Sequence, residues 1–317
     1  MSPVGSGAKQ TDVADTGSLS PSKLEKVDDY PLYVLRLEGD YGFSEYLRTG
    51  RLNYRFSDGS GHSCTCFTAM GEGSDPLFGR NFDFPENPAL LLYTDPPDGY
   101  ASVSMVDLGY FGYGMGRLPD LEGDLKDLRM TPYLPFDGMN EHGLAVGMAA
   151  ISQAEPPHDP SKGTIGEIQV IRLLLDRARD VDGALALLGE YNVEMTEPPI
   201  HYIVADRSGR SAIVEYVDGE MVVLRDDDPY QVITNFIVYD SGAPGLAPCS
   251  RYRSAYSGLR EVGGTVSMEE AMDLLEGSSQ ESTIWSTVYN LETGDLNVAM
   301  GGRYKRVHSF NATVAED

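Results

Sequence analysis

Apolar and polar residues alternate over several short segments of the chain, which is the pattern of strands that bury one face. The alternation predicts two strands, Cys64–Met70 and Leu77–Phe84, joined by a turn rich in glycine, serine, aspartate and proline. Similar patterns predict further strands at 33–37, 101–108, 143–150, 201–205, 211–216, 221–224, 231–234, 283–289 and 296–300. Short strands joined by tight turns indicate antiparallel sheets.

Helical patterns occur in pairs between these strands. The first pair is predicted from residue 168 onward and over 181–191, with Thr164-x-x-Glu167 as a capping box at its start. The second pair is predicted over 250–262 and 268–275, with Ser267-x-x-Glu270 as its capping box, and a short helix is predicted over 43–47. This order predicts an α+β fold in which helix pairs cover sheet faces, rather than a doubly wound parallel fold.

The composition changes near residue 63. Residues 1–28 are rich in Ser, Gly, Asp and Lys without apolar periodicity and predict a tail, and a polar run over 57–63 ends at Cys64. Residues 1–63 hold 7 basic and 9 acidic side chains, which leaves 17 of the 24 basic and 40 of the 49 acidic residues to 64–317. The sequence therefore predicts a boundary at this point.

The charge of the chain limits its partners. A net charge of −25 over 317 residues makes nucleic acid or an anionic membrane surface an unsuitable partner, because phosphate binding needs clustered Lys and Arg. No stretch approaches the ~20 apolar residues of a membrane span. The printed N-terminus lacks the apolar core of a signal peptide, which favours the cytoplasm but leaves open a secreted protein with a trimmed signal. A monomer and a homo-oligomer are equally compatible with the sequence.

The cysteines exclude a disulfide framework and a zinc site. The chain has only Cys64, Cys66 and Cys249, and no second group of Cys or His completes a metal-binding pattern. A glycine-rich phosphate loop is also missing from the sequence, so we predict neither a metal nor a cofactor.

One of these cysteines has charged neighbours in the predicted hairpin. Antiparallel pairing of the two strands brings Arg80 and Asp83 beside Cys64. A guanidinium favours the thiolate form of a cysteine, and a carboxylate can hold an ammonium group. The spacing alone leaves open a second interpretation, in which Arg80 and Asp83 form a surface ion pair and Cys64 is a buried apolar residue.

Five motifs in this order resemble the choloylglycine hydrolase family. They are Cys64-Thr65, Gly79-Arg80-Asn81-x-Asp83, Asp137-Gly138-Met139-Asn140-Glu141-His142-Gly143-Leu144, Val232-Ile233-Thr234-Asn235 and Ser250-Arg251-Tyr252. This is the linear-amide branch of the N-terminal-nucleophile hydrolases, with bile salt hydrolases, penicillin V acylases, acid-ceramidase-like enzymes and isopenicillin N acyltransferases. The resemblance runs from about residue 30 to the C-terminus. It implies a four-layer αββα sandwich of two antiparallel sheets.

The resemblance also implies roles for individual residues. By position, Cys64 is the nucleophile, Arg80 its thiolate neighbour and Asp83 the partner of its free α-amino group. Asn235 is implied as an oxyanion donor and Arg251 as a further active-site residue.

Three further residues are predicted to bind substrate. They are Asn81, Phe84 and Asn140. The Asn81 region is expected to supply a main-chain N–H to the oxyanion, and for Asn140 bracing of its own turn is the alternative. Bile salt hydrolases have a second asparagine about ten positions after the Asn of the Asn-Glu-x-Gly-Leu run. Ala150 stands at that place here, which argues against bile-salt specificity.

The position of Cys64 in the chain implies processing. The bile-acid and penicillin members carry their cysteine directly after the initiator Met, whereas 63 residues precede Cys64 here, as in the members made as precursors. The resemblance therefore implies self-cleavage at Ser63–Cys64, with a tail and propeptide over 1–63 and a catalytic domain over 64–317.

The activity implied is hydrolysis of a small-molecule N-acyl amide through a thioester. Two alternatives remain open: an acyltransferase of the same fold that passes the acyl group to an amine, and a non-catalytic binding protein that retains the fold.

Overall fold

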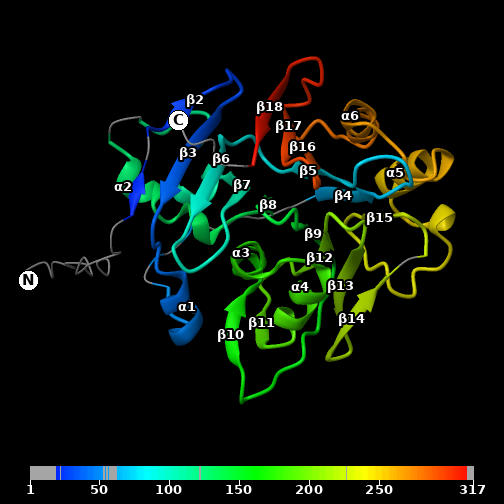
Figure 1. Ribbon diagram of the computed structural model, residues 1–317, viewed down its shortest axis with the longest axis horizontal. Coiled ribbons are helices and arrows are strands. Elements are labelled where there is room, and N and C mark those ends of the chain that lie inside the picture. Colours follow the sequence, from blue (N-terminus) through cyan, green and yellow to red (C-terminus); the bar gives the residue numbers. More distant parts are fainter. Residues whose placement is uncertain are drawn as a thin grey trace, which may run out of the picture.

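Two β-sheets packed face to face form the centre of the computed structural model, which describes residues 19–21, 23–52, 54, 56, 63–120, 123–225 and 227–312 (Figure 1). Within that part of the chain, sheet A has ten strands, in the order β1-β3-β6-β7-β8-β9-β12-β13-β14 with β2 paired to β3. Sheet B has six strands, in the order β15-β4-β5-β16-β17-β18. Most neighbouring strands are antiparallel, as short hairpin connections require.

The bounds of the strands and helices are as follows. Sheet A contains β1 (Ser20–Pro21), β2 (Glu25–Lys26), β3 (Leu32–Glu38), β6 (Ala89–Asp95), β7 (Ser102–Asp107), β8 (Asp137–Asn140), β9 (Ala145–Ala150), β12 (Ile200–Ala205), β13 (Ser211–Val217) and β14 (Glu220–Leu224). Sheet B contains β4 (Ser63–Ala69), β5 (Leu77–Asp83), β15 (Tyr230–Ile233), β16 (Thr283–Asn290), β17 (Asp295–Met300) and β18 (Val307–Asn311). A small parallel pair is formed by β10 (Gly163–Gly166) and β11 (Tyr191–Glu194). The α-helices are α1 (Phe43–Thr49), α2 (Leu125–Leu128), α3 (Glu167–Arg177), α4 (Val181–Leu188), α5 (Ser250–Glu261) and α6 (Met268–Glu276), with 3-10 helices η1 (Leu108–Phe111), η2 (Thr131–Tyr133) and η3 (Pro244–Leu246).

Helix pairs cover the outer faces of the two sheets. The pair α3 and α4 packs on sheet A, and the pair α5 and α6 packs on sheet B (Figure 1). Apolar side chains from the inner faces of both sheets fill the space between them, and most are fully buried. The predicted α+β sandwich with αββα layers is therefore confirmed, with one parallel pair in sheet A, between β3 and β6.

Some local predictions are wrong. Thr164 is not a helix cap, because 163–166 pair as β10 with β11 and the helix begins after Gly166 without a side-chain cap. The helix predicted over 181–191 ends at Leu188, since Tyr191 belongs to β11. The capping box at Ser267 and Glu270 is confirmed.

The strands β1, β2 and β3, which precede Cys64 in the chain, belong to sheet A. β3 pairs along its whole length with β6, and its residues Leu32 and Leu35 are fully buried. The expected tail over 1–28 does not extend through 23–28: β2 pairs with β3, Leu24 is fully buried, and the buried Asp28 pairs with side chains of the C-terminal part. Residues 1–18 and 57–62 lie outside the described part of the chain.

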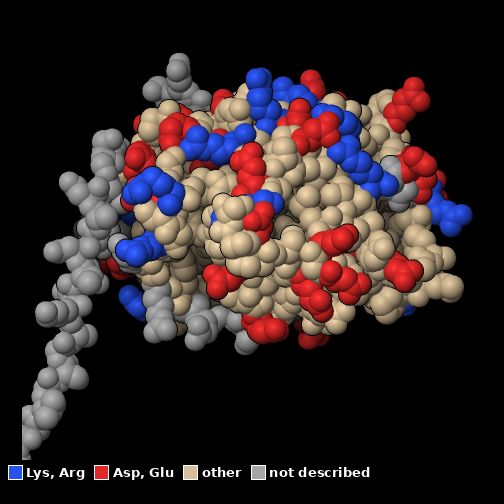
Figure 2. Space-filling model, turned by 90° about the horizontal axis from the view of Figure 1, so that it is seen from below, with Lys and Arg blue, Asp and Glu red and all other residues tan. Residues whose placement is uncertain are grey.

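The face shown in Figure 2 carries acidic and basic side chains interspersed, without a broad basic area. Within the described ranges, no helix combines the length and apolar character that crossing a membrane would require. The same residues contain no group of three or more His, Cys, Asp or Glu side chains arranged to hold a metal ion.

Candidate active site

Cys64 lies at the start of β4, on the face of sheet B that packs against sheet A. The register of β4 with β5 places Cys64 opposite Phe82 and Cys66 opposite Arg80. Because side chains alternate along a strand, Cys64 and Cys66 point to the same side, and the Cys66 thiol reaches the Met148 carbonyl oxygen of sheet A at 3.6 Å. Both thiols are fully buried.

Arg80 connects the Cys64 thiol to a buried carboxylate. Its Nη2 lies 3.3 Å from Cys64 Sγ, its Nη1 donates to the Phe136 carbonyl oxygen, and its Nε lies 3.2 Å from Asp137 Oδ2. Burial raises the pKa of the Cys64 thiol above its ordinary value, and the charge of Arg80 acts against that rise. Among the neighbours that favour the thiolate in this buried position, the guanidinium of Arg80 has the largest effect.

Asp137, at the start of β8 in sheet A, is held by donors from one strand of sheet B. Trp285 Nε1, Thr287 Oγ1 and Tyr289 OH, all on β16, donate to it at 3.1, 3.4 and 2.5 Å. Sequence reasoning gave Asp137 no role, although it begins the motif around Asn140. Its carboxylate fixes the orientation of Arg80.

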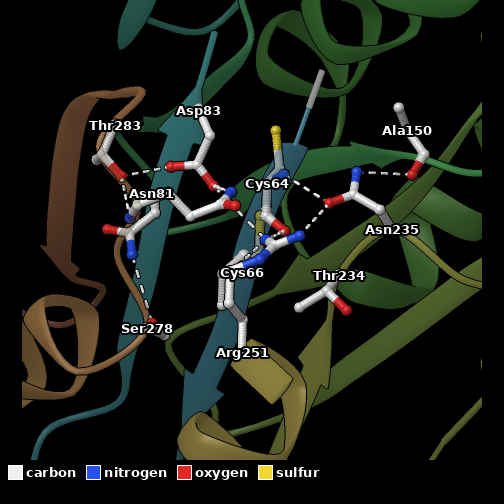
Figure 3. Close-up of polar contacts among 12 residues, drawn as sticks. Cys64, Cys66, Asn81, Asp83, Ala150, Thr234, Asn235, Arg251, Ser278 and Thr283 are labelled. Atoms are coloured by element: carbon white, nitrogen blue, oxygen red, sulfur yellow. Dashed lines mark hydrogen bonds and ion pairs between the residues drawn. The ribbon is translucent and has the colours of Figure 1, made fainter. Parts of the chain in front are cut away.

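Asn235 takes the place of a missing strand partner at Cys64. Strand β15 ends at Ile233, opposite Cys66, so no main-chain partner on that side reaches Cys64 N. The side chain of Asn235 fills the position: its Oδ1 accepts from Cys64 N at 2.9 Å, and its Nδ2 donates to the Ala150 carbonyl oxygen at 2.8 Å (Figure 3). The main-chain nitrogen of Cys64 is thereby held by a side chain.

Arg251, in the first turn of α5, holds the other side of the same residue. Its Nη1 donates to the Cys64 carbonyl oxygen at 2.6 Å and to Thr65 Oγ1 at 3.0 Å, and its Nη2 donates to Asn235 Oδ1 at 2.7 Å (Figure 3). A single guanidinium therefore links the main chain of Cys64 with the side chain of Asn235.

Asp83 lies opposite Ser63 in the register of β4 and β5. Its carboxylate accepts from Thr283 Oγ1 at 2.5 Å and from Gln280 Nε2 at 2.7 Å, and Arg251 Nη1 lies 3.5 Å from it. Burial raises the pKa of Asp83, and these three neighbours act in the opposite direction. The structure thus brings Cys64, Arg80, Asp83, Asn235 and Arg251 into one cluster.

Two predicted substrate-binding residues point elsewhere. Asn81 lies on the opposite face of β5 from Arg80, where its carboxamide is bonded to Leu275 O, Ser278 Oγ and Ser286 Oγ under α6. Asn140 donates to Leu175 O and Ala178 O at the end of α3 and accepts from two amides of its own turn. Both side chains are buried and bonded in these positions, and the bonds of Asn140 within its own turn agree with the bracing interpretation; a substrate contact of either residue stays a prediction.

Phe84 leads from the cluster toward a cavity. Its ring stacks on Tyr110 with centroids 6.0 Å apart and lies 5.9 Å from that of Phe82. Tyr110 in turn lines a cavity of about 620 Å³ with Leu134 and Met148. A substrate contact for Phe84 stays a prediction.

The chain is similar to proteins of known family. A family model described as linear amide C-N hydrolases, choloylglycine hydrolase family, matches residues 64–243. Among curated proteins, it is 31% identical over 125 residues to an uncharacterized protein of Paramecium bursaria Chlorella virus 1, and 29% identical over 116 residues to a penicillin V acylase of Pectobacterium atrosepticum. These matches cover 36% and 33% of this chain and only 44% and 31% of the two relatives.

Solved structures share the fold over most of their length. A penicillin V acylase from Agrobacterium tumefaciens aligns with a TM-score of 0.56 at 19% identity, over 78% of this chain and 86% of that one. A conjugated bile acid hydrolase from Clostridium perfringens aligns with a TM-score of 0.57 at 14% identity, over 78% and 92%. At these identities the likeness concerns the fold, and it agrees with the predicted sandwich.

Proposed function

Because the chain belongs to the choloylglycine hydrolase family of linear amide C-N hydrolases, we propose that it cuts its own Ser63–Cys64 bond and then hydrolyses an N-acyl amide with the exposed N-terminal cysteine. One observation carries this proposal. The thiol of Cys64 and its main-chain nitrogen are held by separate groups, Arg80 on the sulfur and Asn235 on the nitrogen. A nucleophile and its future base are thus positioned within one residue.

Self-cleavage begins with the thiol. The Cys64 sulfur attacks the carbonyl carbon of Ser63, the bond between that carbon and Cys64 N breaks, and the thiol proton moves to the nitrogen. Water then hydrolyses the resulting thioester, which leaves a carboxylate on Ser63 and a free thiol and α-amino group on Cys64. Asn235 Oδ1 supports this step because it already binds the nitrogen that leaves.

Turnover repeats this chemistry on an external amide. An α-amino group has an ordinary pKa near 8, so it can take the thiol proton at neutral pH, and no separate histidine base is needed. The thiolate attacks the substrate carbonyl, the amine leaves with the proton, and water resolves the thioester. In this proposal the carboxylate of Asp83 holds the ammonium form of the Cys64 α-amino group.

In the proposal Asn235 is the hydrogen-bond donor that stabilises the oxyanion of the tetrahedral intermediate. Its carboxamide nitrogen donates to the Ala150 oxygen, and in the proposal it also donates to the tetrahedral intermediate. Loss of such a donor lowers a rate by about 10²–10³-fold.

The cavity supports an apolar acyl group on the substrate. One part of its wall is apolar, with Tyr110, Leu134, Met148 and Ile200, while Glu167, Glu194 and Glu197 line another part. Phe84 stacks on Tyr110 of the apolar part and directly follows Asp83 of the cluster. The solved neighbours are named as a penicillin V acylase and a conjugated bile acid hydrolase.

The proposal is tested by the intact mass of the purified protein and N-terminal sequencing of each species. We expect a chain that begins at Cys64, and a full-length chain in Cys64→Ala; Cys249→Ala is the matched control, which should cut normally. A processed chain in Cys64→Ala would refute self-cleavage. Release of free acid from acyl amides, measured with and without an acceptor amine, then distinguishes hydrolysis from acyl transfer.

A further inference from the structure

A buried pair of ionisable side chains lies between the sheets and outside the cluster described above. His201 on β12 and Glu215 on β13 are both fully buried, and His201 Nδ1 lies 2.7 Å from Glu215 Oε1. The other ring nitrogen, Nε2, lies 2.8 Å from the carbonyl oxygen of Thr234. Thr234 directly precedes Asn235, so this pair is in contact with the segment that carries a proposed catalytic residue.

The imidazole of His201 lies between groups of two different segments. A carbonyl oxygen can only accept, so Nε2 donates to Thr234. Glu215 also accepts from the main-chain amides of Val238 and Tyr239, both at 2.8 Å. The two side chains therefore bind each other and, through their remaining polar atoms, one segment of the chain.

These bonds fix both ends of one loop. Strand β15 ends at Ile233, and the chain from 234 to 239 continues without a strand partner. His201 holds its first carbonyl group and Glu215 holds two amides at its other end, with Asn235 between them. The loop is thus attached to β12 and β13 of sheet A through two side chains.

The polarity of the pair needs an explanation beyond packing. Burying an ion pair removes both groups from water, and apolar residues of similar volume usually stabilise a core as well or better. What an apolar pair cannot do is bind the carbonyl oxygen of the buried Thr234 and two amides at the other end of the same loop.

We propose that His201 and Glu215 are positioning residues, which hold the 234–239 loop so that the carboxamide of Asn235 faces the main-chain nitrogen of Cys64. The inference rests on the proposed function, because the catalytic role of Asn235 is part of that proposal. Neither residue touches the thiol. They act through the loop.

Two conservative variants separate this role from general stability. In His201→Gln, the side-chain amide can replace Nε2 and keep the bond to Thr234; in His201→Asn, it can replace Nδ1 and keep only the bond to Glu215. Both variants remove the imidazole ring and put a neutral carboxamide in its place. We expect His201→Gln to stay within a few-fold of the wild-type kcat, and His201→Asn to lose about 10²-fold with KM changed less than about twofold, because small misplacement of a catalytic group costs that much.

A second buried ion pair provides the control. Arg172 and Asp176 lie 2.6 Å apart on α3, on the outer side of sheet A. Asp176→Asn breaks a pair of comparable burial without contact to the 234–239 loop, and its kcat should stay at the wild-type value.

Hydrogen exchange of the uncut Cys64→Ala chain gives a readout that does not depend on activity. In this Cys64→Ala background, amide exchange in the 234–239 segment should be faster when His201→Asn or Glu215→Gln is added than when His201→Gln or Asp176→Asn is added. Equal exchange and equal kcat in the two His201 variants would overturn the inference. If the wild type neither cuts itself nor turns over amides, the proposed function fails, and the ordering of the exchange rates alone supports or overturns the attachment of the loop.

Discussion

Replacing Arg80 by Gln or Asp137 by Asn breaks the same buried ion pair, yet the two changes should move the pKa of the Cys64 thiol in opposite directions. Arg80→Gln removes the cation beside the sulfur and leaves a buried anion, so the pKa rises. Asp137→Asn removes the anion and leaves the guanidinium to the thiolate, so the pKa falls. Loss of stability alone cannot produce opposite signs.

The distance between Arg80 Nη2 and Cys64 Sγ sets the size of the first effect. At 3.3 Å and an effective dielectric constant of about 20, Coulomb's law gives about 5 kcal/mol. The guanidinium charge is spread over its nitrogens and shared with Asp137, so we take about half, ~2–3 kcal/mol, or about two pKa units. The thiolate fraction at neutral pH should then fall about 100-fold in Arg80→Gln.

The assay is the rate of Cys64 alkylation by iodoacetamide as a function of pH, followed by mass spectrometry of the peptide that contains it. A Cys249→Ser background removes the half-buried thiol from competition. A shift of the same sign in both variants would refute the assignment of Arg80 as the group that stabilises the thiolate, as would an unchanged profile in Arg80→Gln.

Three further outcomes are expected. Gly143→Ala should lower the free energy of unfolding in urea by about 1–3 kcal/mol more than Gly209→Ala, because both glycines need a left-handed φ but only at Gly143 would a Cβ lie 2.1 Å from the Leu291 carbonyl oxygen; equal losses would contradict this. Burial raises the pKa of Asp107 from 3.8 to about 7. Between these two pH values the folded state keeps a proton that the unfolded state releases. The stability that this proton contributes is therefore lost as pH rises through about 7. Asp107→Asn should remove that slope in unfolding experiments between pH 5 and 8, and an unchanged slope would assign it to other groups. Asp83→Asn should lower kcat, since the α-ammonium group loses its anchoring charge, and a wild-type kcat would remove Asp83 from the mechanism.

The part of the site that could be predicted from sequence is the part set by local pairing. A short turn fixes the register of β4 and β5, so the neighbourhood of Cys64 and Arg80 follows from counting residues along a hairpin. The family motifs added Asn235 and Arg251, which come from distant segments that no turn connects to β4. The helix pairs could be predicted from the periodicity of apolar residues, and the covering of sheet faces by helices could be predicted from the order of the elements.

Two features of the structure differ in whether the sequence could reveal them. The direction of the Asn81 side chain could be read from the sequence: neighbouring residues on a strand point to opposite faces, so a side chain next to the inward Arg80 had to face the helices. For the wrong prediction of a helix cap at Thr164 no local signal existed. The pairing of β10 with β11 joins segments more than 25 residues apart.

The parallel pairing of β3 with β6 has a practical consequence for handling the protein. If the Ser63–Cys64 bond is cut, the two polypeptides remain one folded body, because Leu32, Leu35 and Leu37 stay buried at ~1.5–3 kcal/mol each. An affinity tag on the N-terminal fragment should therefore retain the C-terminal fragment in native buffer and release it only in denaturant. A gene truncated to start at Cys64 would instead expose the edge of β6 and yield an aggregation-prone product.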